Sequence, residues 1–206
     1  MRFPRIKSRV VVGLAIAALV VGGGWLAFKP SHKTSFPATG QKTGQVLTAP
    51  SSSQTGDASN LPYIETAEFK YVQPANWVQM SQKVLDVSGA SSGIARPTAP
   101  AATFSIKVSA AIPKDNDDLK NSTLNELKKF SHFALITSAD TKVDGKNGQK
   151  FIYSFSDTSG QNKVIQYMSV VVNKNKTFFL LFSSAAGDYD KQAGDFASIL
   201  SSFHFK

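Results

Sequence analysis

Strict alternation of apolar and polar side chains marks much of the second half of the chain as strand-forming. Residues 103–110 alternate Phe, Ile, Val and Ala with Thr, Ser, Lys and Ser, the period of a strand with one polar face. Similar apolar segments follow at 133–143, 149–157, 163–173 and 177–184. The short runs between them contain Asp-Gly, Asn-Gly, Ser-Gly or Lys-Asn-Lys, which suit tight turns. The pattern predicts an antiparallel meander.

Two stretches have helical spacing instead. Leu124, Leu127 and Phe130 recur every third residue, and Ser122 before them is a residue type that caps helix N-termini. A second helix is predicted from about residue 188 to 203 near the C-terminus. Its apolar residues share one face: Phe196, Ile199, Leu200 and Phe203.

The region before the meander contains a predicted strand and a loop. Apolar residues at 69–72 predict a strand that ends before Pro74, which has no N–H for a sheet. Trp77 follows after a short turn, and the Gly-, Ser-, Ala- and Pro-rich residues 88–102 are predicted to form a loose loop. Strands, helix, meander and helix in this order predict one α+β domain over 61–206, an antiparallel sheet covered by helices.

The first 60 residues follow a different pattern. Residues 10–28 contain no charged side chain, and at ~1.5 Å per residue a helix of this length spans the ~30 Å core of a bilayer. Four basic residues within 2–9 precede it, so residues 1–29 are predicted to be a signal anchor with a cytoplasmic N-terminus. A cleaved signal peptide is the alternative. Residues 30–60, rich in Ser, Thr, Pro and Gly, are predicted to be a disordered tether.

Composition refines this picture in two ways. The chain has 23 Lys and Arg against 14 Asp and Glu, a net charge of +9, but part of the excess lies in residues 1–29 and concerns membrane topology. Lysines at the predicted hairpin tips alternate with aspartates, and the strand aromatics are predicted to form the core, so no nucleic-acid partner is expected. The chain has no cysteine, which excludes disulfides, thiolate metal sites and a cysteine nucleophile.

One segment matches a hydrolase motif. Residues 89–93, Gly-Ala-Ser-Ser-Gly, fit G-x-S-x-G, in which Ser91 would be the nucleophile. That motif needs a strand before the serine and a helix directly after it. Residues 83–87 suit a strand before the serine, but residues 94–100 contain two prolines and do not start a normal helix. A serine hydrolase of the cell envelope that uses Ser91 is therefore kept only as an alternative, and no catalytic residue is assigned.

A second segment partly resembles a calcium loop. Asp115, Asp117 and Glu126 occupy positions one, three and twelve of such a loop, but Leu119 and Lys120 stand where an oxygen ligand and a Gly are needed. The acids equally suit a helix N-terminus, where the helix dipole favours negative charge. The histidines are widely separated, at His32, His132 and His204. No metal ligand and no cofactor is assigned, although metal binding at the acidic residues stays open.

Both ends of the folded region resemble those of the PsbP-like family. The first end has Phe69, Tyr71, Pro74 and Trp77 at the family's spacing, with Asn76 where the family often has Gly. The other end has the strand 178–182, and it continues with Tyr189, Phe196 and the closing Ile-Leu-Ser-Ser-Phe of residues 199–203. The resemblance implies an α/β/α sandwich without catalytic residues that serves as a binding or assembly module, often anchored to a membrane.

The sequence as a whole predicts a membrane-tethered module of the cell membrane that does no chemistry. Its N-terminus is expected in the cytoplasm and its C-terminal domain outside. A protein partner in the cell envelope is expected. A module that binds a small ligand or a lipid is a further alternative.

Overall fold

The computed structural model describes residues 61–157 and 159–206 of the chain. The predicted anchor, residues 1–29, and the predicted tether, residues 30–60, lie outside these described residues. Within the described part, every helix is too short or too polar to span a bilayer.

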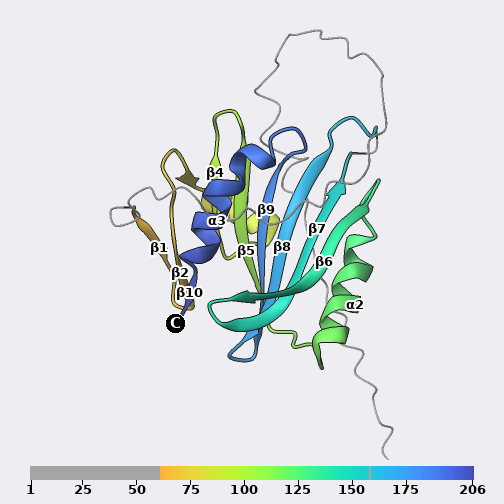
Figure 1. The fold of residues 1–206 in the computed structure, drawn as a ribbon. Coiled ribbons are helices and arrows are strands. Elements are labelled where there is room, and N and C mark those ends of the chain that lie inside the picture. Colours follow the sequence, from red (N-terminus) through yellow and green to blue (C-terminus); the bar gives the residue numbers. More distant parts are fainter. Residues whose placement is uncertain (1–60, 158) are drawn as a thin grey trace, which may run out of the picture.

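Seven antiparallel strands form the main sheet (Figure 1). In spatial order they are β3 (Val78–Gln79), β4 (Ser92–Arg96), β5 (Ala102–Ser109), β9 (Lys176–Ala185), β8 (Val164–Asn173), β7 (Lys146–Phe155) and β6 (Ala134–Val143). Strands β6 to β9 pair in chain order, which confirms the predicted meander. Strand β9 then pairs with β5 and links the meander to the earlier part of the sheet.

Tight turns fix the register of the meander. Asp144 and Gly145 connect β6 to β7 with φ of 48° and 73°, and Lys174 and Asn175 connect β8 to β9 with φ of 46° and 59°. Positive φ at both central residues is the hairpin geometry that matches the twist of the strands. Because the first turn lies at Asp144, the predicted start of β7 at residue 149 is wrong, and Asn147-Gly148 belongs to the strand.

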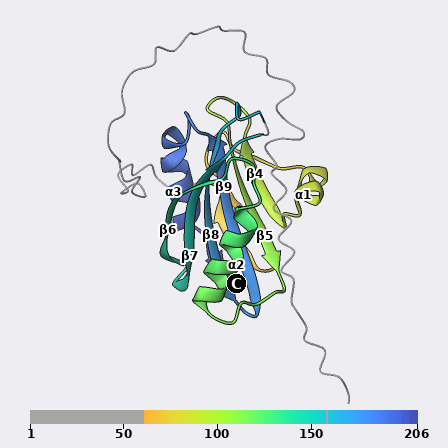
Figure 2. The ribbon, with the colours of Figure 1, turned by 90° about the vertical axis from the view of Figure 1, so that its right-hand side faces the viewer.

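The main sheet is covered on both faces. One face carries α3 (Ala193–Ser201), with the short η3 (Asp190–Gln192) before it, beside a second sheet. That sheet has the order β1 (Tyr63–Glu65), β2 (Phe69–Val72) and β10 (His204–Phe205). Helices α1 (Gln82–Ser88) and α2 (Asn116–Leu127) lie on the other side (Figure 2). The predicted α+β class is therefore confirmed.

Alternation along each strand divides the interior into two cores. On β9, Phe178, Leu180 and Phe182 pack toward α3 and the small sheet, whereas Phe179 and Leu181 pack toward α2. The strand aromatics predicted to be core are all buried: Phe151, Tyr153, Phe155, Tyr167, Phe178, Phe179 and Phe182. The interior therefore accounts for these rings, and they do not form an exposed base-stacking surface.

Helix α2 begins earlier than predicted. Its N-cap is Asp115, whose carboxylate accepts a hydrogen bond from the Asp118 N–H at 2.8 Å. Ser122 lies inside the helix, where its hydroxyl donates to the Asp118 carbonyl at 2.6 Å. The first turn has no apolar residue before Leu119, so hydrophobic periodicity alone placed the start too late.

The loop predicted at residues 88–102 contains a strand. The segment before it, which was considered as a strand, is a helix. Residues 92–96 form β4, and residues 83–87 lie in α1. Small residues are needed at this point, because a Cβ on Gly93 would stand 2.7 Å from Met80 Sδ and 3.1 Å from the Phe104 carbonyl oxygen. The small residues that indicated a loop are instead explained by close packing of β4 against α1 and β5.

Candidate interaction surface

One edge of the main sheet is long and has no neighbouring strand. Strand β6 lies at one edge of the seven-stranded sheet and has ten residues, whereas β3 at the opposite edge has only two. No other strand of the described residues pairs with the outer side of β6. An unpaired edge of this length is a template for pairing with another chain, which native proteins usually block. We call residues 134–142 the β6 edge.

The β6–β7 turn determines which backbone groups of β6 point outward. In a two-residue hairpin, Val143 and Lys146 flank the turn as a hydrogen-bonded pair, and such pairs alternate with non-bonded pairs along the strands. Register is continuous from this turn back to residue 137. The residues whose N–H and C=O groups point away from β7 are therefore Ser138, Asp140 and Lys142.

The first part of the β6 edge is apolar and exposed. Leu135 and Ile136 are 43% and 40% exposed, and the uncharged run extends to Ala139. A register shift between Leu135 and Thr137 marks a β-bulge, which accommodates these two adjacent apolar residues. The half-buried Phe133 continues the apolar surface inward, with its ring centroid 5.8 Å from that of Tyr153. Large apolar side chains at an unpaired strand edge favour pairing with another chain, and native proteins usually avoid them there.

The second part of the β6 edge is polar and borders a shallow hollow. The hollow has a volume of about 400 Å³ and is lined by Asn116, Asp140, Thr141, Lys142, Asn147 and Gly148. The residues that line it are polar or charged apart from Gly148, a lining that suits the apolar small molecule or lipid considered as an alternative poorly. It leaves open space between the first turn of α2 and the part of β6 and β7 near their turn.

Two buried polar atoms beside this edge have no hydrogen-bond partner among the described residues. They are the Ser138 hydroxyl oxygen and the side-chain carbonyl oxygen of Gln149. The Gln149 amide N–H donates to Asp140 Oδ1 at 2.5 Å, so Asp140 and Gln149 are held together across β6 and β7. A buried polar group without a hydrogen-bond partner lowers the stability of the folded state, and such groups are rare in native proteins.

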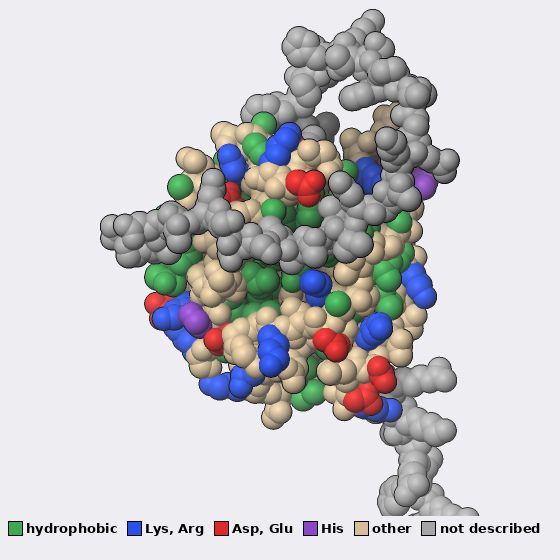
Figure 3. Space-filling view, in the orientation of Figure 1, with side chains coloured by type: hydrophobic (Ala, Val, Ile, Leu, Met, Phe, Trp, Pro, Cys, Tyr) green, Lys and Arg blue, Asp and Glu red, His purple; other side chains and the backbone are tan. Residues whose placement is uncertain are grey.

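The tip of the β6–β7 hairpin is tied to the C-terminus. The Asp144 carboxylate accepts the Phe205 N–H at 2.8 Å and lies 2.9 Å from His204 Nδ1. The hydrogen bond with His204 is the main cause that lowers the pKa of Asp144. Lysines at the same end pair with acids, as in Lys206 with Glu65 at 2.6 Å. Figure 3 shows Lys and Arg side chains interspersed with Asp and Glu on this view of the molecule, rather than a single basic patch.

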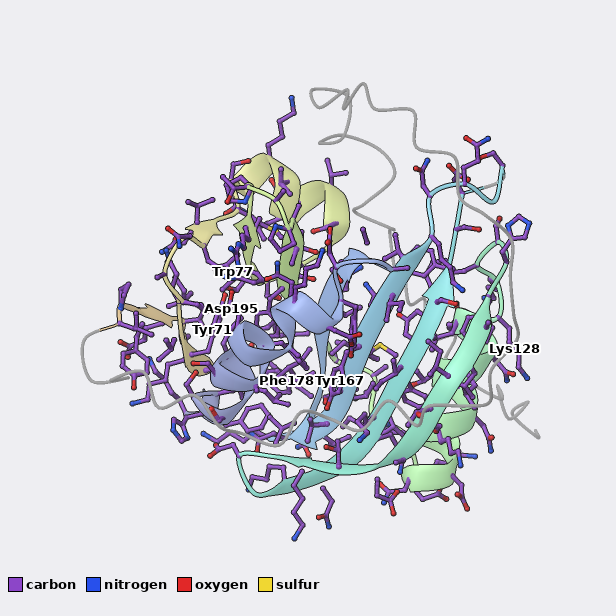
Figure 4. All side chains as sticks on the ribbon, turned by 45° about the horizontal axis from the view of Figure 1, so that its top comes forward. Tyr71, Trp77, Lys128, Tyr167, Phe178 and Asp195 are labelled. Atoms are coloured by element: carbon purple, nitrogen blue, oxygen red, sulfur yellow. The ribbon has the colours of Figure 1, made fainter. Side chains whose placement is uncertain are left out.

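Trp77 is a structural residue. Its side chain is 2% exposed, and its indole N–H donates to Asp195 Oδ2 at 2.8 Å. Asp195 in turn lies 3.3 Å from the Arg96 guanidinium. Figure 4 shows Trp77 and Asp195 at α3. This cluster joins the start of the domain to its last helix, so the Trp of the Phe-x-Tyr-x-x-Pro-x-x-Trp pattern packs the core.

Ser91 does not lie in a nucleophile elbow. It occupies the turn between α1 and β4, so the chain runs helix, turn, strand, the reverse of the order that a G-x-S-x-G nucleophile requires. Its backbone N–H donates to the Ile106 carbonyl at 2.8 Å, and its side chain is exposed. This geometry argues against the alternative of a serine hydrolase.

The acids considered for calcium are separated by α2. Asp115 caps the N-terminus and Glu126 lies near the other end, about 16 Å away at ~1.5 Å per residue, so they cannot share one ion. The Glu126 carboxylate instead pairs with Lys129 at 2.7 Å. His132 Nδ1 lies 3.2 Å from the Asp157 carbonyl oxygen. His32 lies outside the described residues.

The two covered faces and the open sheet edge define a small α+β sandwich. The chain belongs to the PsbP family, whose model matches residues 61–205. Comparison with curated protein sequences gives no match.

Two solved structures share the fold at low sequence identity. Cyanobacterial PsbP from Synechocystis sp. PCC 6803 is 19% identical, with a TM-score of 0.52 over 76% of this chain and 98% of its own. LpqN of Mycobacterium tuberculosis, described as involved in cell envelope biogenesis, is 14% identical, with a TM-score of 0.51 over 67% of this chain and 83% of its own. Both similarities support the PsbP-like fold of the domain.

The sequence interpretation missed the β6 edge. The strand itself was predicted, but which strand lies at an edge depends on the topology of the whole sheet. One signal was present in the sequence, because the adjacent Leu135 and Ile136 break the alternation expected of a half-buried strand. The roles of Ser138, Asp140 and Gln149 follow only from the structure.

Proposed function

We propose that this protein is a membrane-tethered module whose PsbP domain lies outside the cytoplasm and binds another protein chain through the β6 edge. It works by binding and assembly and not by catalysis. Residues 1–29 serve as the anchor and residues 30–60 as the tether.

The tethered arrangement is supported by the sequence. The uncharged run at 10–28 follows a cluster of basic residues, the arrangement that retains an N-terminus in the cytoplasm. A tether of the length of residues 30–60 has a mean reach of roughly 30 Å, enough to hold a domain clear of the lipid headgroups.

The binding role is carried by one observation, the unpaired and partly apolar β6 edge. Edge strands of native proteins are usually short, charged or covered. Strand β6 has ten residues, and the charged residues of its edge come only after Ala139. An extended segment added to it would gain backbone hydrogen bonds and the apolar contacts of Leu135 and Ile136 together.

Cell fractionation tests the tethered arrangement. The full chain is expected in the membrane fraction, resistant to alkaline carbonate, because a spanning helix is not extracted with peripheral proteins. A variant that lacks residues 1–29 is the control and is expected to remain soluble. Protease added to intact cells, with the outer membrane permeabilised where there is one, should digest the domain and leave a small membrane-bound fragment.

Two results would contradict this arrangement. A full chain found in the soluble fraction would remove the anchor. A mature protein shortened by the mass of the N-terminal segment would show that this segment is a cleaved signal peptide.

A further inference from the structure

We infer that the β6 edge pairs with the β6 edge of a second copy of this chain, around a two-fold axis at Ala139. The two seven-stranded sheets then join into one continuous antiparallel sheet. This inference rests on the proposed function in one respect, that the β6 edge is a protein-binding surface, and it names the partner.

Backbone geometry restricts how two such edges can meet. In an added antiparallel strand, outward-pointing residues of one copy must oppose outward-pointing residues of the other, because only these have available N–H and C=O groups. Each outward-pointing residue of one copy must therefore oppose an even-numbered residue of the other copy. The outward-pointing residues are Ser138, Asp140 and Lys142. The possible two-fold axes pass through residues 138, 139, 140 or 141.

The axis at Ala139 satisfies the side chains best. With this axis, Ser138 of each copy lies opposite Asp140 of the other copy. The two-fold symmetry makes this contact twice. Residue Ser138 is only half-buried, so rotation about χ1 turns its hydroxyl, which has no partner among the described residues, toward the Asp140 carboxylate, to which it then donates. Asp140 keeps its hydrogen bond from Gln149 through Oδ1 and accepts the new one on its other oxygen. One contact thus explains an otherwise unsatisfied group at this edge.

The other axes fit less well. An axis at Asp140 places two like charges opposite each other, which destabilises a strand pair. An axis at Ser138 opposes Asp140 to the apolar Ile136. An axis at Thr141 pairs Asp140 with Lys142, but it moves the overlap toward the hairpin tip and leaves Leu135 and Ile136 uncovered.

Two features of the β6 edge favour this approach. Ala139 at the axis is exposed and has only a methyl group, so it does not hold the strands apart. The hollow between the first turn of α2 and β6 leaves room on the helix side of the sheet. Leu135 and Ile136 of each copy come to lie against residues 141–143 of the other, which removes exposed apolar surface from water.

Cysteine cross-linking tests the axis directly, because the chain contains no cysteine. In this register Ala139 opposes itself as a non-bonded antiparallel pair, with Cα atoms about 4.5 Å apart, within the range that a disulfide spans. The full-length Ala139→Cys variant is oxidised mildly in detergent micelles and examined on a non-reducing gel. Val87→Cys, at a 73% exposed apolar position on α1, is the matched control.

The Ala139→Cys variant is expected to form a covalent dimer about tenfold faster than Val87→Cys, since pairing raises the effective thiol concentration. Thr141→Cys should stay near the control rate, because each Thr141 then opposes Thr137. Adding Ser138→Ala to Ala139→Cys should slow the cross-link severalfold. Circular dichroism confirms that each variant is folded.

Equal rates for Ala139→Cys and Val87→Cys would overturn the inference, because contact through the anchors alone would not favour the β6 edge. Faster cross-linking at Thr141 than at Ala139 would overturn the axis. If Ala139→Cys stays monomeric while the β6 edge still retains a different protein, the inference fails and the proposed function stands.

Discussion

Replacing Trp77 with Ala is expected to lower the free energy of unfolding by about 3–5 kcal/mol. The indole is almost fully buried, and its ring centroid lies 6.3 Å from that of Phe182, so truncation leaves a large cavity beside α3. It also removes the hydrogen bond to Asp195 that links the first part of the domain to the last helix. Urea unfolding monitored by circular dichroism measures the change.

Trp77→Phe is the matched control for this prediction. It keeps an aromatic ring in the cavity but loses the N–H donor, so a smaller loss of about 1–2 kcal/mol is expected. Equal losses in the two variants would assign the effect to the hydrogen bond rather than to burial. An unchanged midpoint for Trp77→Ala would mean that the ring is exposed, which would contradict the fold.

Replacing Lys107 with Met is expected to remove a rise in stability at alkaline pH. Lys107 lies on β5 opposite Phe179 and is 8% exposed, and this burial lowers the pKa of its ammonium group from 10.5 to about 8. Between these two values the unfolded chain binds more protons than the folded chain, so the free energy of unfolding rises with pH. One pKa unit corresponds to about 1.4 kcal/mol, so the rise from pH 8 to 10.5 is about 2–3 kcal/mol.

The measurement compares the variant with the wild type at each pH. Buried tyrosines, including Tyr71 with its pKa raised to about 12, titrate in both proteins and cancel in the difference. The difference in unfolding free energy is expected to shift by about 2–3 kcal/mol across this window for Lys107→Met. The exposed Lys163→Met is the control for removing one lysine charge from the surface. A constant difference for Lys107→Met would show that Lys107 keeps an ordinary pKa in the folded state.

The meander and the last helix were predictable because local signals agreed with the global fold. Turn residues separate the strands, and β6 to β9 pair with their neighbours in the sequence. Elements that depend on distant partners were missed. The short β1 pairs with one side of β2. Strand β10, which follows more than a hundred residues later in the chain, pairs with the other side. The small residues of β4 are set by packing against Met80 and α1, which no local period reveals.

The predicted exposure of the polar side chains of β5 was also wrong. Ser105 and Lys107 were expected on a wet face, but both are only 8% exposed. A similar buried polar row occurs on neighbouring strands, where Tyr153 donates to Gln166 and Gln166 donates to Ser183. Side chains of this kind are tolerated inside a protein when they bond one another, so alternation does not identify which face meets water.

The proposed binding surface was even less predictable from the sequence. An edge strand and a central strand have similar composition here, and only the order of strands exposes β6. The unsatisfied Ser138 hydroxyl and the outward direction of its backbone groups require the register of β6 on β7. Sheet topology and one hydroxyl without a partner among the described residues thus single out the β6 edge.

Capture from the cell membrane tests the central claim most directly. The full chain carrying one affinity tag is co-expressed with a second copy carrying another, solubilised in mild detergent and purified through the first tag. The wild type and the control Val87→Lys are expected to retain the same protein, which is the second copy or another chain. Leu135→Lys combined with Ile136→Lys is expected to lose it. Equal retention by all three, or no protein retained by the folded wild type, would contradict a binding role for the β6 edge.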